Sequence, residues 1–232
     1  MAANLQRAGY PLTVWNRSAE RAATFVAAGA RLAESPAAAS LAADIVISSL
    51  ADDASVRAVV SGSDGVLAGL RPGAIHIGAS TISPGLTEEL AKLHAEAGGR
   101  YVAGPVVGRV TAAEAAQLAT FVAGDADAIE AARAVITTYA PRMVVVGERH
   151  GGAAVAKLIA NFLGACAIDL MGESLAWAEK SGLPPGLVPQ MLAGFFGNPG
   201  TREYIAKIGG ARLRAGQGDG LPRLASFRLP GR

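Results

Sequence analysis

The side chains best suited to chemistry are Lys157 and Asn161, four residues apart in an otherwise apolar stretch. This spacing places both on the same side of a helix. A lysine within an apolar run is costly to bury unless its charge is paired or lost. Lys157 is therefore a candidate catalytic ammonium, with the Asn161 amide beside it to orient a substrate. A simpler interpretation, in which Lys157 extends to solvent from the helix start, stays open on spacing alone.

The helix that carries this pair is expected to extend over residues 153–181, because no proline lies between Ala153 and Lys180. Such a helix spans on the order of 40 Å. Its first half is apolar on nearly all sides, which predicts burial on more than one face. The single cysteine, Cys166, lies in this helix and is expected to be a small buried hydrophobic residue. One cysteine allows no internal disulfide, which fits a reducing compartment.

Composition excludes several classes of protein. The chain is 51% hydrophobic and 17% charged, so it can bury a substantial core. Its net charge of +2 gives no reason to expect nucleic acid or a membrane surface as a partner. No run approaches about 18 apolar residues, and the start lacks the pattern of a secretion signal. The three histidines show no ligand spacing, so no metal is expected. We therefore expect a cytoplasmic protein.

Strand and helix signals alternate over the first 149 residues. This alternation predicts an α/β fold with a doubly wound parallel sheet. Residues 44–50 form a continuous apolar run, typical of a strand buried on both faces. The expected strands are 12–15, 30–33, 44–50, 74–77, 101–103, 119–123 and 143–146, and the main expected helices are 19–28, 53–70 with a break at the glycines, 84–97 and 126–138.

No strand signal remains after residue 153. We therefore expect one domain over residues 1–149, a helical domain over 150–209 and an irregular tail over 210–232. The tail is rich in arginine and glycine, but an aspartate and scattered leucines interrupt any basic patch, so a nucleic-acid-binding arm is not expected.

Short motifs follow one another along this pattern in a specific order. They are Asn16-Arg17-Ser18, Leu50-Ala51, Ser80-Thr81-Ile82-Ser83-Pro84, Gly104-Pro105-Val106-Val107-Gly108 and Lys157-x-x-x-Asn161. Over roughly residues 1–209, their order and spacing resemble the β-hydroxyacid dehydrogenases, the family of 3-hydroxyisobutyrate dehydrogenase. The resemblance implies a Rossmann-like domain, a long interdomain helix and an all-helical domain for substrate binding and dimerisation.

The resemblance also implies roles at the substrate site. Lys157 matches the catalytic lysine, and desolvation would lower its pKa toward the range of an acid–base catalyst. Asn161 matches the amide that orients the substrate, and Gly108 lies in the loop whose backbone can approach a carboxylate. The family's Ser-Gly-Gly reads Val107-Gly108-Arg109 here, so Arg109 is expected to replace the lost hydroxyl as a carboxylate donor.

The implied cofactor is NADP, with NAD as the alternative. An arginine with a hydroxyl neighbour, as in Asn16-Arg17-Ser18 at the end of a strand, suits the extra phosphate of NADP, whereas an acid would suit NAD. Leu50, Ala51 and Thr81 match positions along the cofactor groove. A surface arginine and ordinary strand-end packing are the competing interpretations of these residues.

In the family, a strand and a glycine-rich phosphate turn precede the Met-Ala-x-Asn-Leu with which this chain begins. The chain is therefore expected to be truncated at its N-terminus, and at its C-terminus, where a further lysine of the family has no counterpart. In the strand order 3-2-1-4-5-6, the missing first strand lies between strands 12–15 and 44–50.

The resulting prediction is an NAD(P)-dependent oxidoreductase that transfers a hydride between a nicotinamide cofactor and a small β-hydroxyacid or semialdehyde. We expect it to form a homo-oligomer through the helical domain. One alternative is a catalytically inactive fragment that only folds or dimerises. Another is a relative that reduces a different C=O or C=N substrate, against which the Lys157/Asn161 pair argues.

Overall fold

The computed structural model describes residues 1–184 and 186–197. Contacts divide the chain into two compact units, Met1–Gly164 and a second unit that starts at Ala165. The predicted tail over residues 210–232 lies outside the described residues. The assignment of separate roles to residues 1–149 and 150–209 stays a prediction.

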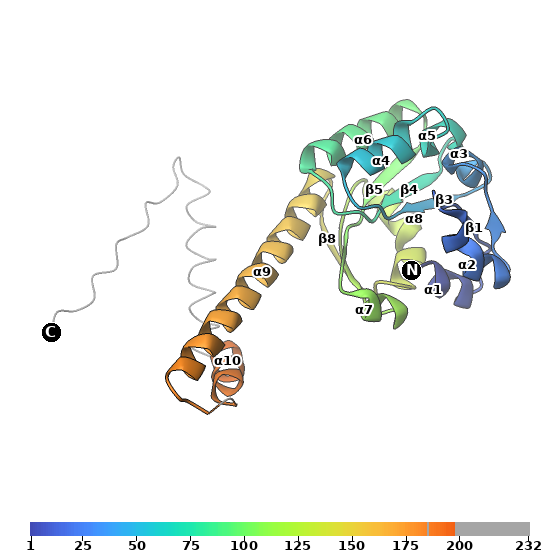
Figure 1. Cartoon of the computed structure of the whole chain (residues 1–232). Coiled ribbons are helices and arrows are strands. Elements are labelled where there is room, and N and C mark those ends of the chain that lie inside the picture. Colours follow the sequence, from blue (N-terminus) through green and yellow to red (C-terminus); the bar gives the residue numbers. More distant parts are fainter. Residues whose placement is uncertain (185, 198–232) are drawn as a thin grey trace, which may run out of the picture. The chain divides into compact units, whose positions relative to one another are not determined.

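The first unit contains two sheets (Figure 1). In the small sheet, β1 (Thr13–Val14) pairs in parallel with β2 (Arg31–Leu32). The large sheet has the order β3-β4-β5-β7-β6, with β8 paired to β7. Its strands are β3 (Ile45–Ser48), β4 (Ile75–Gly78), β5 (Arg100–Ala103), β6 (Val106–Val107), β7 (Ala119–Ala123) and β8 (Arg142–Gly147).

The large sheet is mostly parallel, as predicted, but its last strands reverse direction. Strands β3, β4 and β5 are parallel neighbours. Strand β7 runs antiparallel to β5 and β6, and β8 runs parallel to β7. The link from β6 to β7, residues 108–118, explains the reversal, because a parallel connection needs a crossover of a dozen or more residues.

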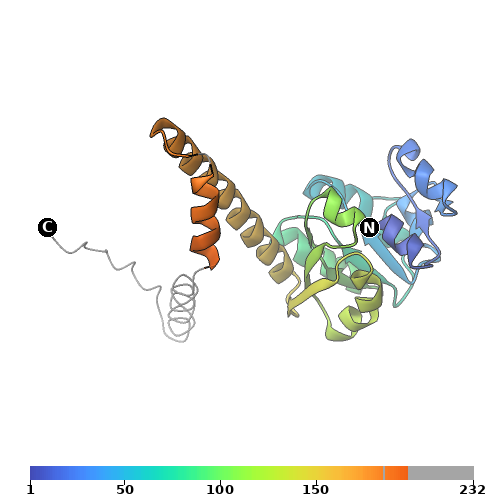
Figure 2. The same cartoon turned by 90° about the horizontal axis from the view of Figure 1, so that it is seen from below.

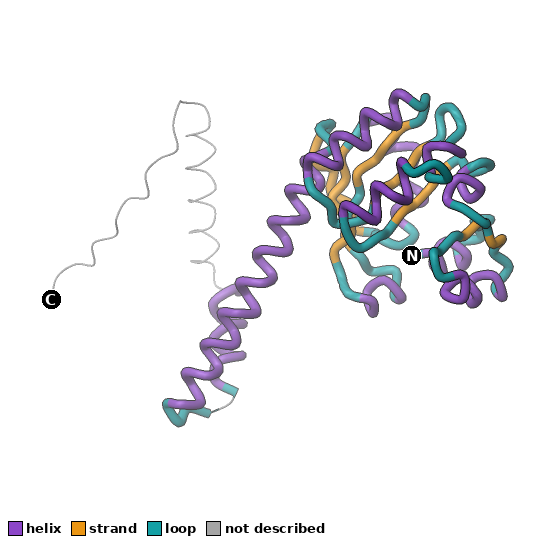
Figure 3. The backbone as a smooth tube through the Cα atoms, turned by 45° about the horizontal axis from the view of Figure 1, so that its top comes forward, coloured by secondary structure: helices purple, strands orange, loops and turns teal. Residues whose placement is uncertain are grey.

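Helices cover both faces of the large sheet (Figures 1 and 3). Alternate strand residues point to opposite faces, so Ile77 and Val102 join a core with α8 (Ala126–Thr137). Tyr101 belongs to a second core with α4 (Asp53–Ser61) and α6 (Pro84–Glu96). The other helices are α1 (Ala2–Arg7), η1 (Ala19–Ala22), α2 (Ala23–Ala27), α3 (Pro36–Ser40), α5 (Val66–Gly69), α7 (Val110–Glu114), α9 (Gly151–Lys180) and α10 (Leu187–Gly197).

Polar side chains fix the starts of three helices. The Ser83 hydroxyl accepts from the backbone N–H of Leu86 at the start of α6, at 3.2 Å. Ser35 caps α3 in the same way, and Asp52 caps α4. Ser35-Pro36 and Ser83-Pro84 both open helices, because proline suits the first helical position.

No ladder joins the two sheets, so within the described residues the edge of β3 that faces away from β4 is unpaired. The prediction that β3 is buried on both faces is wrong, since Ile45, Val46 and Ile47 are only half-buried. The blue N-terminal elements lie beside β3 in both views (Figures 1 and 2). Side chains connect the N-terminal elements to β3. Leu5 of α1 belongs to the core against which Ile45 and Ile47 pack.

Helix α9 begins as a packed helix and continues as an exposed one. Ala153 and Ala154 are buried against the first unit, whereas Ile159, Phe162 and other apolar side chains further on are exposed. The predictions of burial on several faces and of a buried Cys166 are therefore wrong for this chain. By length and composition alone, α9 is the one helix among the described residues that could cross a membrane.

Candidate active site

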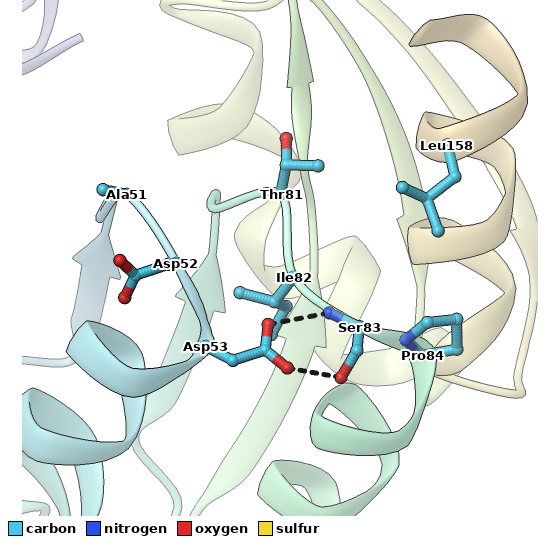
Figure 4. Close-up of a pocket in the computed structure, with 8 residues that line it drawn as sticks. All are labelled: Ala51, Asp52, Asp53, Thr81, Ile82, Ser83, Pro84 and Leu158. Atoms are coloured by element: carbon cyan, nitrogen blue, oxygen red, sulfur yellow. Dashed lines mark hydrogen bonds between the residues drawn. The ribbon is translucent and has the colours of Figure 1, made fainter. Parts of the chain in front are cut away.

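The carboxyl ends of β3 and β4 meet at one edge of the large sheet, because Ser48 pairs with Gly78. A hollow of about 500 Å³ opens beside them (Figure 4). The predicted cofactor residues Ala51 and Thr81 both line it. The complete lining is Ala51, Asp52, Asp53, Thr81, Ile82, Ser83, Pro84 and Leu158.

Hydrogen bonds fasten the two loops at this hollow to one another. The Leu50 N–H donates to Ser80 Oγ at 2.8 Å. The Asp53 carboxylate accepts from the backbone N–H of Ser83 at 2.9 Å and from its hydroxyl at 2.5 Å (Figure 4). The structure therefore brings Leu50, Ala51 and Thr81 together at the strand ends, and their role in cofactor binding stays a prediction. Sequence reasoning assigned no role to Asp53, although its place at the start of the helix that follows a predicted strand was a usable signal.

Lys157 is buried, with 9% of its surface exposed. It lies one turn beyond Ala153, which is fully buried, and the next residue, Leu158, lines the hollow. Burial lowers the pKa of Lys157 below the usual 10.5. The ion pairs formed within the described residues do not include it. Lys157 is therefore mostly buried near the start of α9 and does not extend freely into solvent.

The predicted substrate residues lie on two further segments. Asn161 is exposed one turn beyond Lys157 on α9. Gly108 has φ of 140°, and a Cβ there would lie 2.6 Å from Leu118 Cδ2, so this position requires glycine. Arg109 follows as the exposed N-cap residue of α7. Among the described residues, no hydrogen bond joins this loop to Lys157 or Asn161.

Side chains of α1 hold the helix that follows this loop. Asn4 is buried and donates from Nδ2 to the carbonyl of Ala113 at 2.8 Å. Arg7 donates to the carbonyl of Glu114 at 2.8 Å. Both carbonyls belong to the last turn of α7, where intrahelical partners are lacking. The first helix is thereby tied to the predicted substrate loop, a link that the sequence did not reveal.

The predicted phosphate-binding residues follow β1 directly. The backbone N–H of Ser18 donates to Asn16 Oδ1 at 3.0 Å, which closes a tight Asx turn. Arg17 lies between them and is exposed. The turn thus leaves Arg17 exposed near the end of β1, and its role in binding a phosphate stays a prediction.

Two histidines form a buried chain that the sequence did not predict. His76 Nδ1 lies 2.8 Å from His94 Nε2, and His76 Nε2 lies 2.8 Å from Ser48 Oγ. His94 Nδ1 lies 2.6 Å from the Leu90 carbonyl, which can only accept. Neutral rings then require His94 Nδ1–H, His76 Nδ1–H and a donating Ser48 hydroxyl. Among the described residues, no cluster of three or more potential metal ligands is found.

Burial is the main cause that lowers the pKa of His94 to about 4 and that of His76 well below 6.5. A depressed folded pKa contributes stability above pH 6.5 that is lost as the pH falls through the folded value. We therefore expect the free energy of unfolding to decrease between pH 6.5 and 4, by up to about 3 kcal/mol from His94 alone. Urea unfolding across this pH range measures the free energy of unfolding. If its dependence on pH were unchanged in His94→Gln, the contribution assigned to His94 would be wrong.

A family model described as the NAD binding domain of 6-phosphogluconate dehydrogenase matches residues 1–147. Among curated proteins, an uncharacterized oxidoreductase of Bacillus subtilis, YfjR, is 40% identical over 204 residues, which cover 88% of this chain and 71% of that protein. The 2-(hydroxymethyl)glutarate dehydrogenase of Eubacterium barkeri is 31% identical, covering 88% and 66%. The human cytokine-like nuclear factor N-PAC is also 31% identical, covering 78% of this chain and 33% of N-PAC.

Several solved structures are also similar to this chain. The 3-hydroxyisobutyrate dehydrogenase of Mycobacterium tuberculosis with L-serine has a TM-score of 0.78 at 31% identity, covering 85% of this chain and 66% of that one. A Streptomyces aurantiacus imine reductase has a TM-score of 0.77 at 28% identity, covering 93% and 74%. Psf3 in complex with NADP+ and 2-OPP has a TM-score of 0.74 at 25% identity, covering 97% and 84%.

The mostly parallel sheet, the hollow at its strand ends and these matches define an NAD(P)-binding oxidoreductase with a Rossmann-like domain. The chain belongs to the β-hydroxyacid dehydrogenase family.

Proposed function

We propose that the protein is an NADP-preferring oxidoreductase that acts on a small β-hydroxyacid or the corresponding semialdehyde. The observation that carries this proposal is the buried Lys157 next to Leu158, which lines the hollow at the ends of β3 and β4. A small molecule bound there would meet the loop that carries Thr81 and the helix that carries the buried Lys157. The relatives named as dehydrogenases of hydroxyacids support the substrate class.

In the proposed reaction, bound nicotinamide cofactor supplies or accepts the hydride. Lys157 donates a proton to the carbonyl oxygen of the semialdehyde as its carbon is reduced, and takes the hydroxyl proton in the reverse direction. Asn161 orients that oxygen from one turn further along α9. The backbone of Gly108 and the guanidinium of Arg109 bind the substrate carboxylate, because arginine pairs with carboxylates through two parallel hydrogen bonds.

Replacement of Arg17 tests the cofactor preference. Arg17 is exposed at the end of β1, where it can pair with the 2′-phosphate of NADP. We expect Arg17→Ala to lower kcat/KM for NADPH by about 10-fold or more, since a charge-assisted hydrogen bond is worth about 1.5–3 kcal/mol, and to leave NADH unaffected. Steady-state rates with both cofactors measure this in a protein with a β-strand and a Gly-x-Gly-x-x-Gly turn added before Met1, with Arg21→Ala in η1 as the control. An equal loss with NADH would contradict the role of Arg17.

Reduction of a C=N bond is a second candidate, favoured by the similarity to an imine reductase. An inactive protein that only folds or dimerises is a third. Rates of the same extended protein with a panel of small β-hydroxyacids and cyclic imines separate these candidates. Turnover of imines alone would replace the hydroxyacid assignment, and cofactor binding without turnover of either class would favour the inactive protein.

We also propose that the protein forms a homo-oligomer through α9. In the first unit the helix exposes a row of apolar side chains, namely Val155, Leu158, Ile159, Phe162 and Leu163. Such a surface is unfavourable in water and indicates a partner. A second copy is the partner that supplies an equally apolar helix, whereas a lipid bilayer would have to accept Lys157 and Asp169.

We expect the protein to sediment as a dimer, and Phe162→Asp to shift it to the monomer, because Phe162 is 67% exposed and charging it would disrupt an apolar interface. Leu41→Asp is the matched control, since Leu41 is 66% exposed on another part of the first unit. A monomeric parent, or a parent recovered with membranes, would contradict the proposed dimer.

The proposed location is the cytoplasm, and the proposed partners include no nucleic acid or membrane.

A further inference from the structure

The start of α9 is fastened to the first unit by a residue distant in sequence. The backbone N–H of Gly151 donates to Glu88 Oε1 at 2.9 Å, and Glu88 lies on α6. The first turn of α9 contains no acidic residue of its own. Free N–H groups and a partial positive charge at a helix start favour an anionic acceptor. Glu88 supplies both the acceptor and the charge.

Contacts on either side of Gly151 reinforce this attachment. His150 Nε2 lies 2.9 Å from the Tyr101 carbonyl, to which it donates, and the two rings are stacked with centroids 6.0 Å apart. A Cβ on Gly124 would lie 3.1 Å from His150 Nε2, so glycine makes room for this ring. Beyond Gly151, Ala153 is fully buried in the second core. The first turn of α9 is therefore held in one position and direction.

We propose that Glu88 is a positioning residue for Lys157, whose buried place is set by the hydrogen bond between Glu88 and Gly151. Lys157 lies about 9 Å further along a stiff helix, so a change of direction at the helix start displaces its side chain. The importance of this contact for catalysis rests on the proposed function. The position of Lys157 itself can be measured without catalysis.

The test is competitive labelling of lysine amines in the 232-residue chain across a range of pH, with a limiting acylating reagent and mass spectrometry of the peptides. The pH midpoint of labelling at Lys157 reports its desolvation, and the exposed Lys92 is an internal reference. Glu88→Ala removes the acceptor. Gly151→Ala disturbs the same contact from the other side, because its Cβ would lie 2.8 Å from Glu88 Oε1.

Three further variants serve as comparisons. Glu88→Gln keeps an oxygen that can accept from Gly151. Gly152→Ala places a methyl group at the neighbouring position, where the nearest atom, on Val146, lies 3.7 Å away. Ser35→Ala removes the cap of α3 and so lowers stability at a helix distant from Lys157.

We expect Glu88→Ala and Gly151→Ala to raise the Lys157 midpoint by about half a pH unit or more, because a displaced amine is better solvated. Glu88→Gln and the two controls should leave it unchanged. An unchanged midpoint in Glu88→Ala and Gly151→Ala, or an equal rise in Ser35→Ala, would overturn the proposal. A shifted midpoint together with full activity of Lys157→Ala would leave the positioning intact and refute the catalytic role instead.

Discussion

Replacing Lys157 by alanine should lower the rate of hydride transfer by about two orders of magnitude or more, because general acid catalysis contributes about 10²–10⁴-fold. The experiment uses an extended protein, in which a β-strand and a Gly-x-Gly-x-x-Gly turn precede Met1. Cofactor affinity should change much less, since the proposed contacts of the cofactor are with Arg17, Leu50, Ala51 and Thr81. Stopped-flow measurement of nicotinamide absorbance separates hydride transfer from product release.

Ala154→Ser on the same helix is a suitable control, because Ala154 is buried one turn before Leu158 and carries no proposed chemistry. A Lys157→Ala enzyme within about threefold of the parent would show that the buried lysine is structural, since general acid catalysis contributes far more. A large loss in affinity for the cofactor, with the chemical step unchanged, would instead place Lys157 in cofactor binding.

The second large effect concerns the 232-residue chain itself, which we expect to bind dinucleotide weakly. The sequence contains no Gly-x-Gly-x-x-Gly turn, and α1 has only a six-residue span with no side-chain cap. Glycine-rich turns at a helix start hold the pyrophosphate in dinucleotide-binding folds. In addition, the outer edge of β3 is unpaired within the described residues, and unpaired buried backbone groups cost about 1–3 kcal/mol each.

Calorimetric titration with NADPH measures this effect. We expect the extended protein to bind at least about 100-fold more tightly than the 232-residue chain, since about two restored hydrogen bonds to charged groups account for this factor. The added segment should also raise the free energy of unfolding by pairing the edge of β3. Micromolar binding by the chain without the added segment would show that the groove at Ala51 and Thr81 is sufficient without the turn.

The sequence predicted the elements that position the site, because those elements have local causes. Ser83-Pro84 opens α6, and the predicted strand at 119–123 agrees with β7 in both bounds. The predicted strands 44–50 and 74–77 overlap β3 and β4, although β3 ends before and β4 ends after the predicted bound. Apolar pattern and capping residues act over a few neighbouring residues, and the elements that they predict are present in the folded structure.

Contacts between distant segments were not predictable in the same way. The pair Glu88 and Gly151 is separated by 63 residues, and nothing in either local sequence indicates it. The hydrogen bonds that join Ser48, His76 and His94 were not predictable either, because spacing along the sequence could not show that these side chains meet. The apolar pattern of β3 and α9 predicted burial, but pattern does not reveal which partner supplies it, and within this chain both stay partly uncovered.

The most direct test of the acid–base role of Lys157 is rescue of the extended Lys157→Ala enzyme by primary amines in solution. Leu158, the residue after Lys157, lines the hollow through which we expect a small ammonium ion to enter. We predict that hydride transfer recovers in proportion to added ethylamine, while the parent enzyme is unaffected. A Lys157→Ala enzyme that is as fast as the parent without added amine would contradict the proposed mechanism.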